Sequence, residues 1–369
     1  MSEGTKRFAV YAPDMAGGGA ERAALQLAAG LADRGFHADL VLASAKGPRM
    51  AEVPDTVEVV DLGARRVLTS VPALVRYLRR AQPAAMASVL DHANIVALWA
   101  RRIAGHPERL VVVEQNNLSA AADHGESRRD RLMPRIVSRF YPWADCVAGV
   151  SAGVVADLRA QLTTVPDDRY RVIYNPIVTR EMLQKATAPV THPWFTRGDP
   201  VFVAAGRLRP QKDFPTLIRA FHNLRSSRQA RLLILGEGPD RGALQALVRE
   251  LDLDDDVELH GYTDNPYAYF ASGVAFVLSS RWEGLPTVLI EALSCGAPVI
   301  ASDCPSGPRE ILADGRYGRL VPVGDVAALT SALGAALDGE LVRAPDESWL
   351  PYLLDSVVDD YLDAFVGST

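Results

Sequence analysis

Two glutamates, Glu283 and Glu291, flank a segment in which a helix is expected to follow a buried strand. The run of residues 272–278 is short and almost continuously apolar, which is typical of a buried strand in a parallel sheet. Pro286 is favoured at the first helical position, so the helix is predicted to begin near Leu285. A helix that starts at the carboxyl end of a parallel strand offers unpaired N–H groups to a ligand, and phosphate is the expected ligand.

The two carboxylates are expected to bind hydroxyl groups, because carboxylates repel phosphate. A diphosphate held at residues 285–287, which are Leu285, Pro286 and Thr287, would lie between them. A nucleotide-sugar carries hydroxyls on both sides of its diphosphate, on the ribose and on the sugar. The alternative is a solvated glutamate pair beside an ordinary helix, and the spacing alone leaves both interpretations open.

Two cations are expected at the end of the first strand of the second half. Gly206 and Arg207 follow the apolar run 201–205, and Lys212 stands five residues beyond Arg207. Charge-assisted hydrogen bonds contribute about 1.5–3 kcal/mol each, whereas a helix terminus contributes about 0.3–1 kcal/mol. Arg207 and Lys212 are therefore predicted to dominate phosphate binding, unless they are surface cations of an exposed loop.

A glycine loop, Gly17-Gly18-Gly19, follows the first strand and opens a helix, which suits either a phosphate loop or close helix packing. A dinucleotide fingerprint would need a further glycine where Arg22 stands and an acid at the end of the second strand, where residues 44–46 lack one. The sequence therefore argues against NAD binding.

Two aromatic side chains at strand ends are further candidates. His92 directly follows the apolar strand ending near Leu90, and spacing alone leaves catalytic and structural roles open. Tyr262 closes another strand, where its ring either meets a nucleotide base or packs internally.

Composition and length limit the class of protein. With 369 residues, 48% of them hydrophobic and 23% charged, the chain is expected to form two globular domains. No apolar run reaches about 18 residues and no signal-peptide pattern opens the chain, so a cytoplasmic protein is predicted. Cys146, Cys295 and Cys304 are expected to be reduced thiols. A net charge of −6 argues against nucleic acid as a partner.

The order of elements predicts an α/β fold with two doubly wound parallel sheets. Strands are expected at 7–12, 38–43, 85–90, 110–113, 146–150, 201–205, 231–235, 257–259, 274–278, 298–301 and 319–321, with helices such as 21–34 and 71–80 between them. Irregular sequence over 175–199 is the expected hinge. The predicted domains are residues 1–180 and 181–349, and a helix within 350–369 is expected to pack back on the first domain.

Basic stretches in the first half, at 65–66, 76–80 and 128–135, interleave with apolar residues. They suit an anionic membrane surface, and they equally suit solvated helix faces.

Together these segments resemble the retaining glycosyltransferases of family four, which have the GT-B fold of two Rossmann-like domains facing across a cleft. The resemblance covers most of the chain and rests on the segments 17–21, 151–154, 173–176, 206–212, 235–239, 261–269 and 283–291.

The resemblance implies a role for each matching residue. Arg207 and Lys212 would hold the donor diphosphate, Glu283 the transferred sugar and Glu291 the ribose. His92 matches a position near which several family members carry an active-site histidine. The remaining donor contacts would be Gly17, Gly18, Gly19, Gly206, Tyr262, Leu285, Pro286 and Thr287. No cofactor and no metal are expected.

Residues 304–311 look like a branch of this family that is common in bacterial polysaccharide, lipopolysaccharide and lipid-linked glycan assembly, often with UDP-hexose or UDP-N-acetylhexosamine donors. The predicted activity is retaining transfer of such a sugar from a UDP-sugar to a glycan or lipid-linked acceptor, in the cytoplasm and at the inner face of the membrane. Residues 113–117 depart from the Ser-Glu-Arg/His-Asn pattern of many relatives, which leaves the acceptor open. The alternatives are a GT-B sugar-nucleotide epimerase and a non-catalytic sugar-nucleotide-binding subunit.

Overall fold

The computed structural model describes residues 6–16, 18–124 and 128–367. The chain divides into two compact units. The first unit comprises Met1–Ile177 together with Tyr352–Thr369, and the second comprises Val178–Pro351.

The first unit is built on a seven-stranded sheet of order β3-β2-β1-β4-β5-β6-β7, in which every neighbouring pair is parallel. Its strands are β1 (Arg7–Ala12), β2 (His37–Leu42), β3 (Glu58–Asp61), β4 (Ala85–Val89), β5 (Arg109–Glu114), β6 (Cys146–Gly149) and β7 (Tyr170–Val172). The central strands are buried along their length, as their continuous apolar runs predict. This sheet confirms the doubly wound fold that was predicted.

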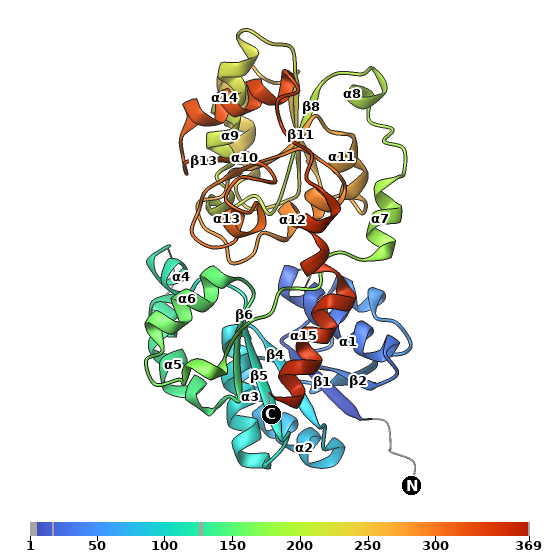
Figure 1. Ribbon diagram of the computed structural model, residues 1–369, viewed down its shortest axis with the longest axis vertical. Coiled ribbons are helices and arrows are strands. Elements are labelled where there is room, and N and C mark those ends of the chain that lie inside the picture. Colours follow the sequence, from blue (N-terminus) through green and yellow to red (C-terminus); the bar gives the residue numbers. More distant parts are fainter. Residues whose placement is uncertain (1–5, 17, 125–127, 368–369) are drawn as a thin grey trace. The chain divides into compact units, whose positions relative to one another are not determined.

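Helices cover both faces of this sheet. They are α1 (Gly19–Asp33), α2 (Val71–Ala81), α3 (Asp91–Ala104), α4 (Leu118–His124), α5 (Arg128–Phe140), α6 (Ala152–Gln161) and, from the end of the chain, α15 (Leu354–Val366). Helix α15 lies beside α1 (Figure 1). A Cβ atom on Gly30 of α1 would come within 2.6 Å of Val358 Cγ2, so the glycine permits this close approach. Arg34 ties the same pair together through Asp359, at 2.6 Å.

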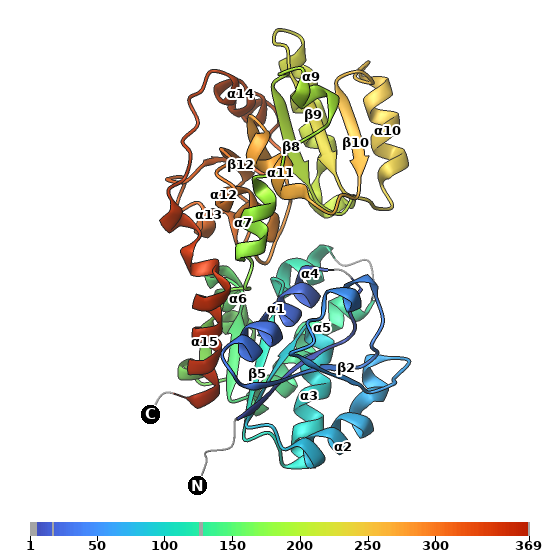
Figure 2. The same ribbon diagram turned by 90° about the vertical axis from the view of Figure 1, so that its right-hand side faces the viewer.

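The second unit carries a six-stranded parallel sheet of order β10-β9-β8-β11-β12-β13. Its strands are β8 (Val201–Ala205), β9 (Arg231–Leu235), β10 (Val257–Gly261), β11 (Ala275–Leu278), β12 (Val299–Ser302) and β13 (Arg319–Val321), and β8, β9 and β10 lie side by side in Figure 2. Its helices are α7 (Arg180–Ala186), α8 (Pro193–Thr196), α9 (Phe214–Arg225), α10 (Arg241–Glu250), α11 (Pro266–Ser272), α12 (Thr287–Ser294), α13 (Pro308–Ile311) and α14 (Val326–Leu337). Phe202, Phe221 and Leu333 are fully buried in its core.

Two expectations need correction. The segment 175–199 is not wholly irregular, because it contains α7 and α8, and α7 packs on α11 of the second unit. The helix expected from Leu285 begins at Thr287, since Pro286 keeps an extended ψ of 92° and acts as the N-cap.

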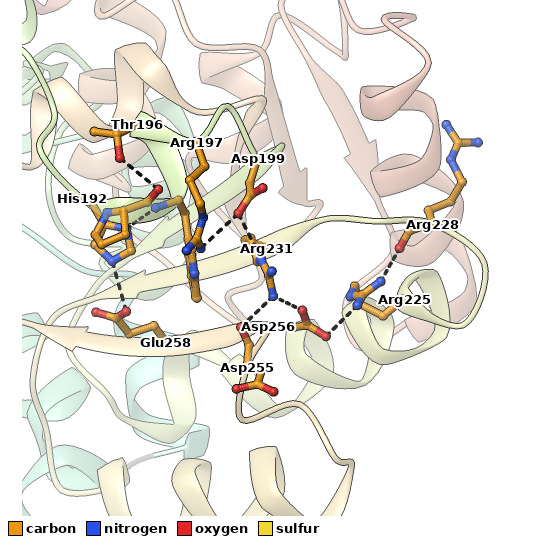
Figure 3. A network of polar contacts seen from close by, with 12 residues as sticks. His192, Thr196, Arg197, Asp199, Arg225, Arg228, Arg231, Asp255, Asp256 and Glu258 are labelled. Atoms are coloured by element: carbon orange, nitrogen blue, oxygen red, sulfur yellow. Dashed lines mark hydrogen bonds and ion pairs between the residues drawn. The ribbon is translucent and has the colours of Figure 1, made fainter.

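The loop before β10 is held by ion pairs. Asp256 pairs with Arg225 at the end of α9 and with Arg231 at the start of β9 (Figure 3).

Candidate functional site

Lys212 and Glu283 form a buried ion pair at the carboxyl ends of two neighbouring strands. Lys212 follows β8 and Glu283 follows β11, and these strands pair in the sheet. Lys212 Nζ lies 2.6 Å from Glu283 Oε1, with the two side chains only 16% and 8% exposed. The structure therefore brings together two of the predicted site residues, which stand 71 positions apart in the chain.

The Glu283 carboxylate is held on one side only. Its Oε1 atom accepts hydrogen bonds from Lys212 Nζ and from Ser280 Oγ, each at 2.6 Å. Its Oε2 atom has no hydrogen-bond partner among the residues described. Since a carboxylate oxygen has lone pairs to spare, Oε2 can accept from a ligand hydroxyl. Lys212 likewise retains N–H donors beyond the one it gives to Glu283.

Hydrogen bonds between the two loops fix this pair. Ser279 Oγ donates to the Lys212 carbonyl oxygen at 2.7 Å, and Gln211 Nε2 donates to the Trp282 carbonyl oxygen at 2.9 Å. The Arg281 backbone N–H donates to the Gln211 carbonyl oxygen at 2.8 Å. The loops after β8 and β11 therefore form one rigid support, in which Lys212 and Glu283 are preorganised.

Arg207 presents its charge from the same strand end. Its side chain is exposed and makes no ion pair within the part of the chain that the structure describes. Gly206 has a φ of +155°, and a Cβ atom there would come within 3.0 Å of Lys212 Cε. A Cβ atom on Gly236, which has a φ of +129°, would lie 2.2 Å from the Gly206 carbonyl oxygen. Both glycines are thus required for the loop geometry that positions the two cations.

The start of α12 lies next to this pair. Thr287 is its first residue, and no side chain caps the preceding Pro286. The Leu289 N–H donates to the Pro286 carbonyl oxygen at 3.0 Å. The N–H groups of Thr287 and Val288 have no acceptor further back in the helix, so this end favours an anion, although Pro286 itself has no N–H to offer. Leu285 is buried beneath the loop at 7% exposure. A Cβ atom on Gly307 would lie 2.4 Å from Pro286 Cδ, so that glycine packs directly against the helix start.

The two glutamates are not a solvated pair. Glu283 is 7% exposed and Glu291, in the second turn of α12, is 4% exposed. Burying a carboxylate is costly without polar partners, and both residues have them. The solvated alternative is therefore excluded.

Tyr262 follows β10 at the same edge of the sheet and is 76% exposed. An exposed ring at this position does not serve internal packing. It is free to contact a planar ligand group.

The remaining candidates belong to the first unit. Gly17 lies outside the described residues. Gly18 is the N-cap of α1 and Gly19 is its first residue, so both lie at an open helix start. A Cβ atom on Gly18 would come within 2.3 Å of Glu21 Oε2, so a side chain there would displace Glu21.

His92 is the second residue of α3, directly after a strained turn at the end of β4. Leu90 has a φ of +76° and a ψ of 137°, a conformation that non-glycine residues adopt only where the surroundings enforce it. His92 Nδ1 lies 2.8 Å from Asp91 Oδ1. Since a carboxylate only accepts, Nδ1 carries the hydrogen and a neutral ring keeps Nε2 as an acceptor.

Glu114 is a buried carboxyl group to which the sequence assigned no role. Tyr141 Oη donates to its Oε2 atom at 2.8 Å, and Asn94 Nδ2 donates to Tyr141 Oη at 2.8 Å. Burial, reinforced by the Asp91 carboxylate, raises the pKa of Glu114 to about 8. This network fixes the turn at the end of β5, close in the sheet to the end of β4.

Sequence reasoning also missed Ser280 and Gln211, which support the Lys212–Glu283 pair. The available signal was position, because both lie within loops that leave the carboxyl ends of buried strands, as ligand-binding residues of α/β sheets do. Their side-chain types alone give no such indication.

Two family models match the chain, one in each half. The one described as "Glycosyl transferase 4-like domain" matches residues 18–176, and the one described as "Glycosyl transferases group 1" matches residues 199–338.

Curated relatives carry the same assignment. A Campylobacter jejuni protein, N-acetylgalactosamine-N,N'-diacetylbacillosaminyl-diphospho-undecaprenol 4-alpha-N-acetylgalactosaminyltransferase, is 32% identical over 69% of this chain and 67% of its own length. The lipopolysaccharide 1,6-galactosyltransferase of Escherichia coli is 29% identical over 55% of each chain, so the match spans about half of that relative. This protein belongs to the family-four type of glycosyltransferases and is a glycosyltransferase.

Solved structures share its fold. Anabaena Alr3699/HepE, solved in complex with UDP, has a TM-score of 0.77 at 19% identity and covers 98% of this chain and 100% of its own. The fold is GT-B, which confirms the predicted fold class. Across the described residues, no helix combines the length and apolar character needed to cross a membrane.

Proposed function

We propose that this glycosyltransferase moves a hexose or an N-acetylhexosamine from a UDP-sugar to an acceptor hydroxyl, with retention of the anomeric configuration. The observation that carries the proposal is the Lys212–Glu283 pair, in which a preorganised ammonium and an open carboxylate oxygen share one strand edge. The former suits a diphosphate and the latter suits a sugar hydroxyl.

Each residue of the second unit has a defined task in this proposal. Arg207, Lys212 and the first turn of α12 bind the diphosphate and stabilise the negative charge that grows on it as the sugar leaves. Glu283 binds the transferred sugar through Oε2. Glu291 binds the ribose, and Tyr262 lies against the base. These cationic groups perform the charge stabilisation that a metal ion would otherwise provide, so the reaction is proposed to need no metal and no cofactor.

In the first unit, the proposal assigns Gly17, Gly18 and Gly19 to a phosphate contact at the start of α1. His92 offers Nε2 to a sugar hydroxyl, and Asp91 fixes its ring orientation.

Relatives support the choice of donor and acceptor. Anabaena Alr3699/HepE was solved with UDP and with UDP-glucose. The printed name of the Campylobacter relative specifies an undecaprenol-diphosphate-linked acceptor, and that of the Escherichia coli relative specifies lipopolysaccharide. We therefore propose a glycan or lipid-linked sugar as acceptor, in bacterial polysaccharide, lipopolysaccharide or lipid-linked glycan assembly.

The test is UDP release from a panel of UDP-sugars and GDP-sugars, with thermal shifts in UDP, GDP and NAD measured alongside. Stabilisation by UDP with slow UDP release from one UDP-sugar is the expected result. Stabilisation by NAD alone would overturn the proposal. A sugar-nucleotide epimerase would convert the donor without an acceptor, and a silent binding subunit would bind UDP yet release none with any acceptor.

A membrane contact through the first unit forms a second part of the proposal. Trp99 and Ile103 of α3 are 40% and 50% exposed. Trp99 packs against Trp143 at 5.2 Å between ring centroids, and the Arg102 guanidinium stacks over Trp143 at 4.7 Å. Exposed indole beside arginine suits the interface of an anionic bilayer.

This contact would place the enzyme in the cytoplasm at the inner face of the membrane. The three free cysteines, two of them buried, suit that reducing compartment. Co-sedimentation with vesicles tests the contact. Binding should require anionic lipid and should weaken in Trp99→Ala. Equal recovery of both proteins with anionic and neutral vesicles would rule the contact out.

A further inference from the structure

Two imidazoles and one carboxylate converge on the outer side of the second unit. Glu258 and His260 alternate along the edge strand β10, so their side chains leave the same face, while Val257 and Leu259 are buried. His192 comes from the turn before α8 and points at the Glu258 carboxylate (Figure 3). Within the portion of the chain described, this is the one group of three such side chains whose ligand atoms all lie within 4.8 Å of one another.

The distances suit a small metal ion. His192 Nε2 lies 3.1 Å from Glu258 Oε2, and His260 Nδ1 lies 2.7 Å from Glu258 Oε1. Ligands bound to zinc at about 2.0–2.1 Å in a tetrahedral site stand about 3.3 Å apart. The first separation is close to this value and the second is shorter by about 0.6 Å. Because the imidazoles face different oxygens of the carboxylate, Glu258 would bind the ion with both oxygens or turn to present one of them.

The ion pairing of Glu258 and the burial of His192 also support metal binding. Among the described residues no lysine or arginine pairs with Glu258, so two imidazoles are the carboxylate's whole set of side-chain partners. The His192 side chain is only 8% exposed and lies against Trp194.

The outward ring nitrogens of the two histidines make different contacts. Both nitrogens that face Glu258 carry a hydrogen, because the carboxylate only accepts, so both histidines have to lose that hydrogen or move it to the other ring nitrogen when a metal binds. Tyr269 Oη lies 3.5 Å from His260 Nε2 and can accept the hydrogen that this nitrogen then carries. His192 Nδ1 accepts the Trp194 backbone N–H at 3.3 Å, so metal binding at Nε2 has to displace that weak hydrogen bond as well.

We propose that His192, Glu258 and His260 bind one divalent transition-metal ion, with Zn²⁺ as the favoured ion because two imidazoles and a carboxylate match its preferences. The site fastens the segment before α8 to β10, and its role is structural. Lys212 and Glu283, which follow β8 and β11, are not among its ligands.

The test uses protein from which any purification tag has been removed and any metal chelated. Calorimetric titration with Zn²⁺ should show one saturable site, and Co²⁺ should give the strong visible absorption of low-coordinate cobalt. His260→Gln and Glu258→Gln should each weaken Zn²⁺ binding by at least about 100-fold, and binding should weaken as the pH is lowered because protons compete with the metal for the ligand atoms.

His37→Gln is the matched control, because His37 is an exposed histidine of the first unit, and it should leave the titration unchanged. Circular dichroism checks that each variant folds. If His260→Gln does not fold, the comparison rests on Glu258→Gln, which is the smallest change. Two results overturn the proposal. One is the absence of a one-to-one site in the wild type, and the other is equal binding by Glu258→Gln and His37→Gln.

Discussion

Replacing Lys212 by methionine separates its charge from its packing. The aliphatic stem of Lys212 lies against Gly206, and methionine retains an unbranched stem of similar volume. What the substitution removes is the ammonium group that lies 2.6 Å from Glu283 Oε1. Turnover should fall about 10²–10³-fold, as it does when one preorganised charge-stabilising donor is lost.

The same substitution should also destabilise the second unit. Glu283 is 8% exposed in its side chain, and without Lys212 its charge keeps Ser280 as a partner but loses its counter-ion. Breaking a buried pair in this way costs about 3–5 kcal/mol. Adding Glu283→Gln removes the unpaired charge, so the double variant should regain much of the stability while its turnover stays low.

Chemical denaturation measures the stability, and steady-state UDP release measures the turnover. Both are applied to the wild type, Lys212→Met, the double variant and a control. Lys185→Met is the matched control, because Lys185 is 48% exposed, pairs with Glu181 on the surface and lies in the same unit. It should change stability by less than about 1 kcal/mol. Turnover of Lys212→Met within about threefold of the wild type would refute the charge role. A double variant no more stable than Lys212→Met would refute the argument from the ion pair.

Four further substitutions test other parts of the structure. Arg207→Ala should leave the melting temperature unchanged, because the side chain is exposed. It should weaken UDP binding, measured by calorimetry, by roughly 10- to 100-fold. A UDP affinity equal to that of the wild type would show that Arg207 is not part of the site. Gly236→Ala should lower both stability and UDP affinity, since its Cβ atom meets the Gly206 carbonyl oxygen, whereas Gly242→Ala, which points into open space on α10, should stabilise by up to about 1 kcal/mol. The raised pKa of Glu114 makes the stability of the folded protein fall as the pH rises from 4.5 to about 8. Glu114→Gln should therefore flatten the decline of the melting temperature across that window. Parallel plots of melting temperature against pH for the wild type and the variant would contradict the raised pKa of Glu114.

The strands were predictable because burial on both faces demands continuous apolar runs. The predictions for β1, β8, β9 and β13 match the structure end to end. The prediction missed the two edge strands of the first sheet: β3, whose residues are largely exposed, and β7, in which Arg171 separates Tyr170 from Val172. Neither offers a run of apolar residues that a sequence pattern can detect.

The site was predictable in its residue types but not in its pairing. A cation after β8 and a carboxylate after β11 were expected to contact the donor separately. Their contact depends on the strand order, in which β11 lies beside β8, and alternation of strands and helices along the chain does not determine that order. The start of α12 moved to Thr287 for a local reason, since the extended backbone at Pro286 delays the first helical turn.

The Lys212–Glu283 ion pair changes the charge that the proposed donor site presents to a diphosphate. Because Glu283 already neutralises Lys212, these two residues together add no net charge to the strand edge, although Lys212 keeps N–H donors for the phosphates. Among the described residues of this edge, Arg207 and the neighbouring Arg209 are exposed and make no ion pair, and the start of α12 adds a partial positive charge. If the site binds a diphosphate as proposed, we expect its long-range attraction, which salt screens, to come mainly from these exposed arginines, whereas Lys212 would act at contact distance. Sequence reasoning gave Arg207 and Lys212 equal weight, and their different surroundings predict different tasks.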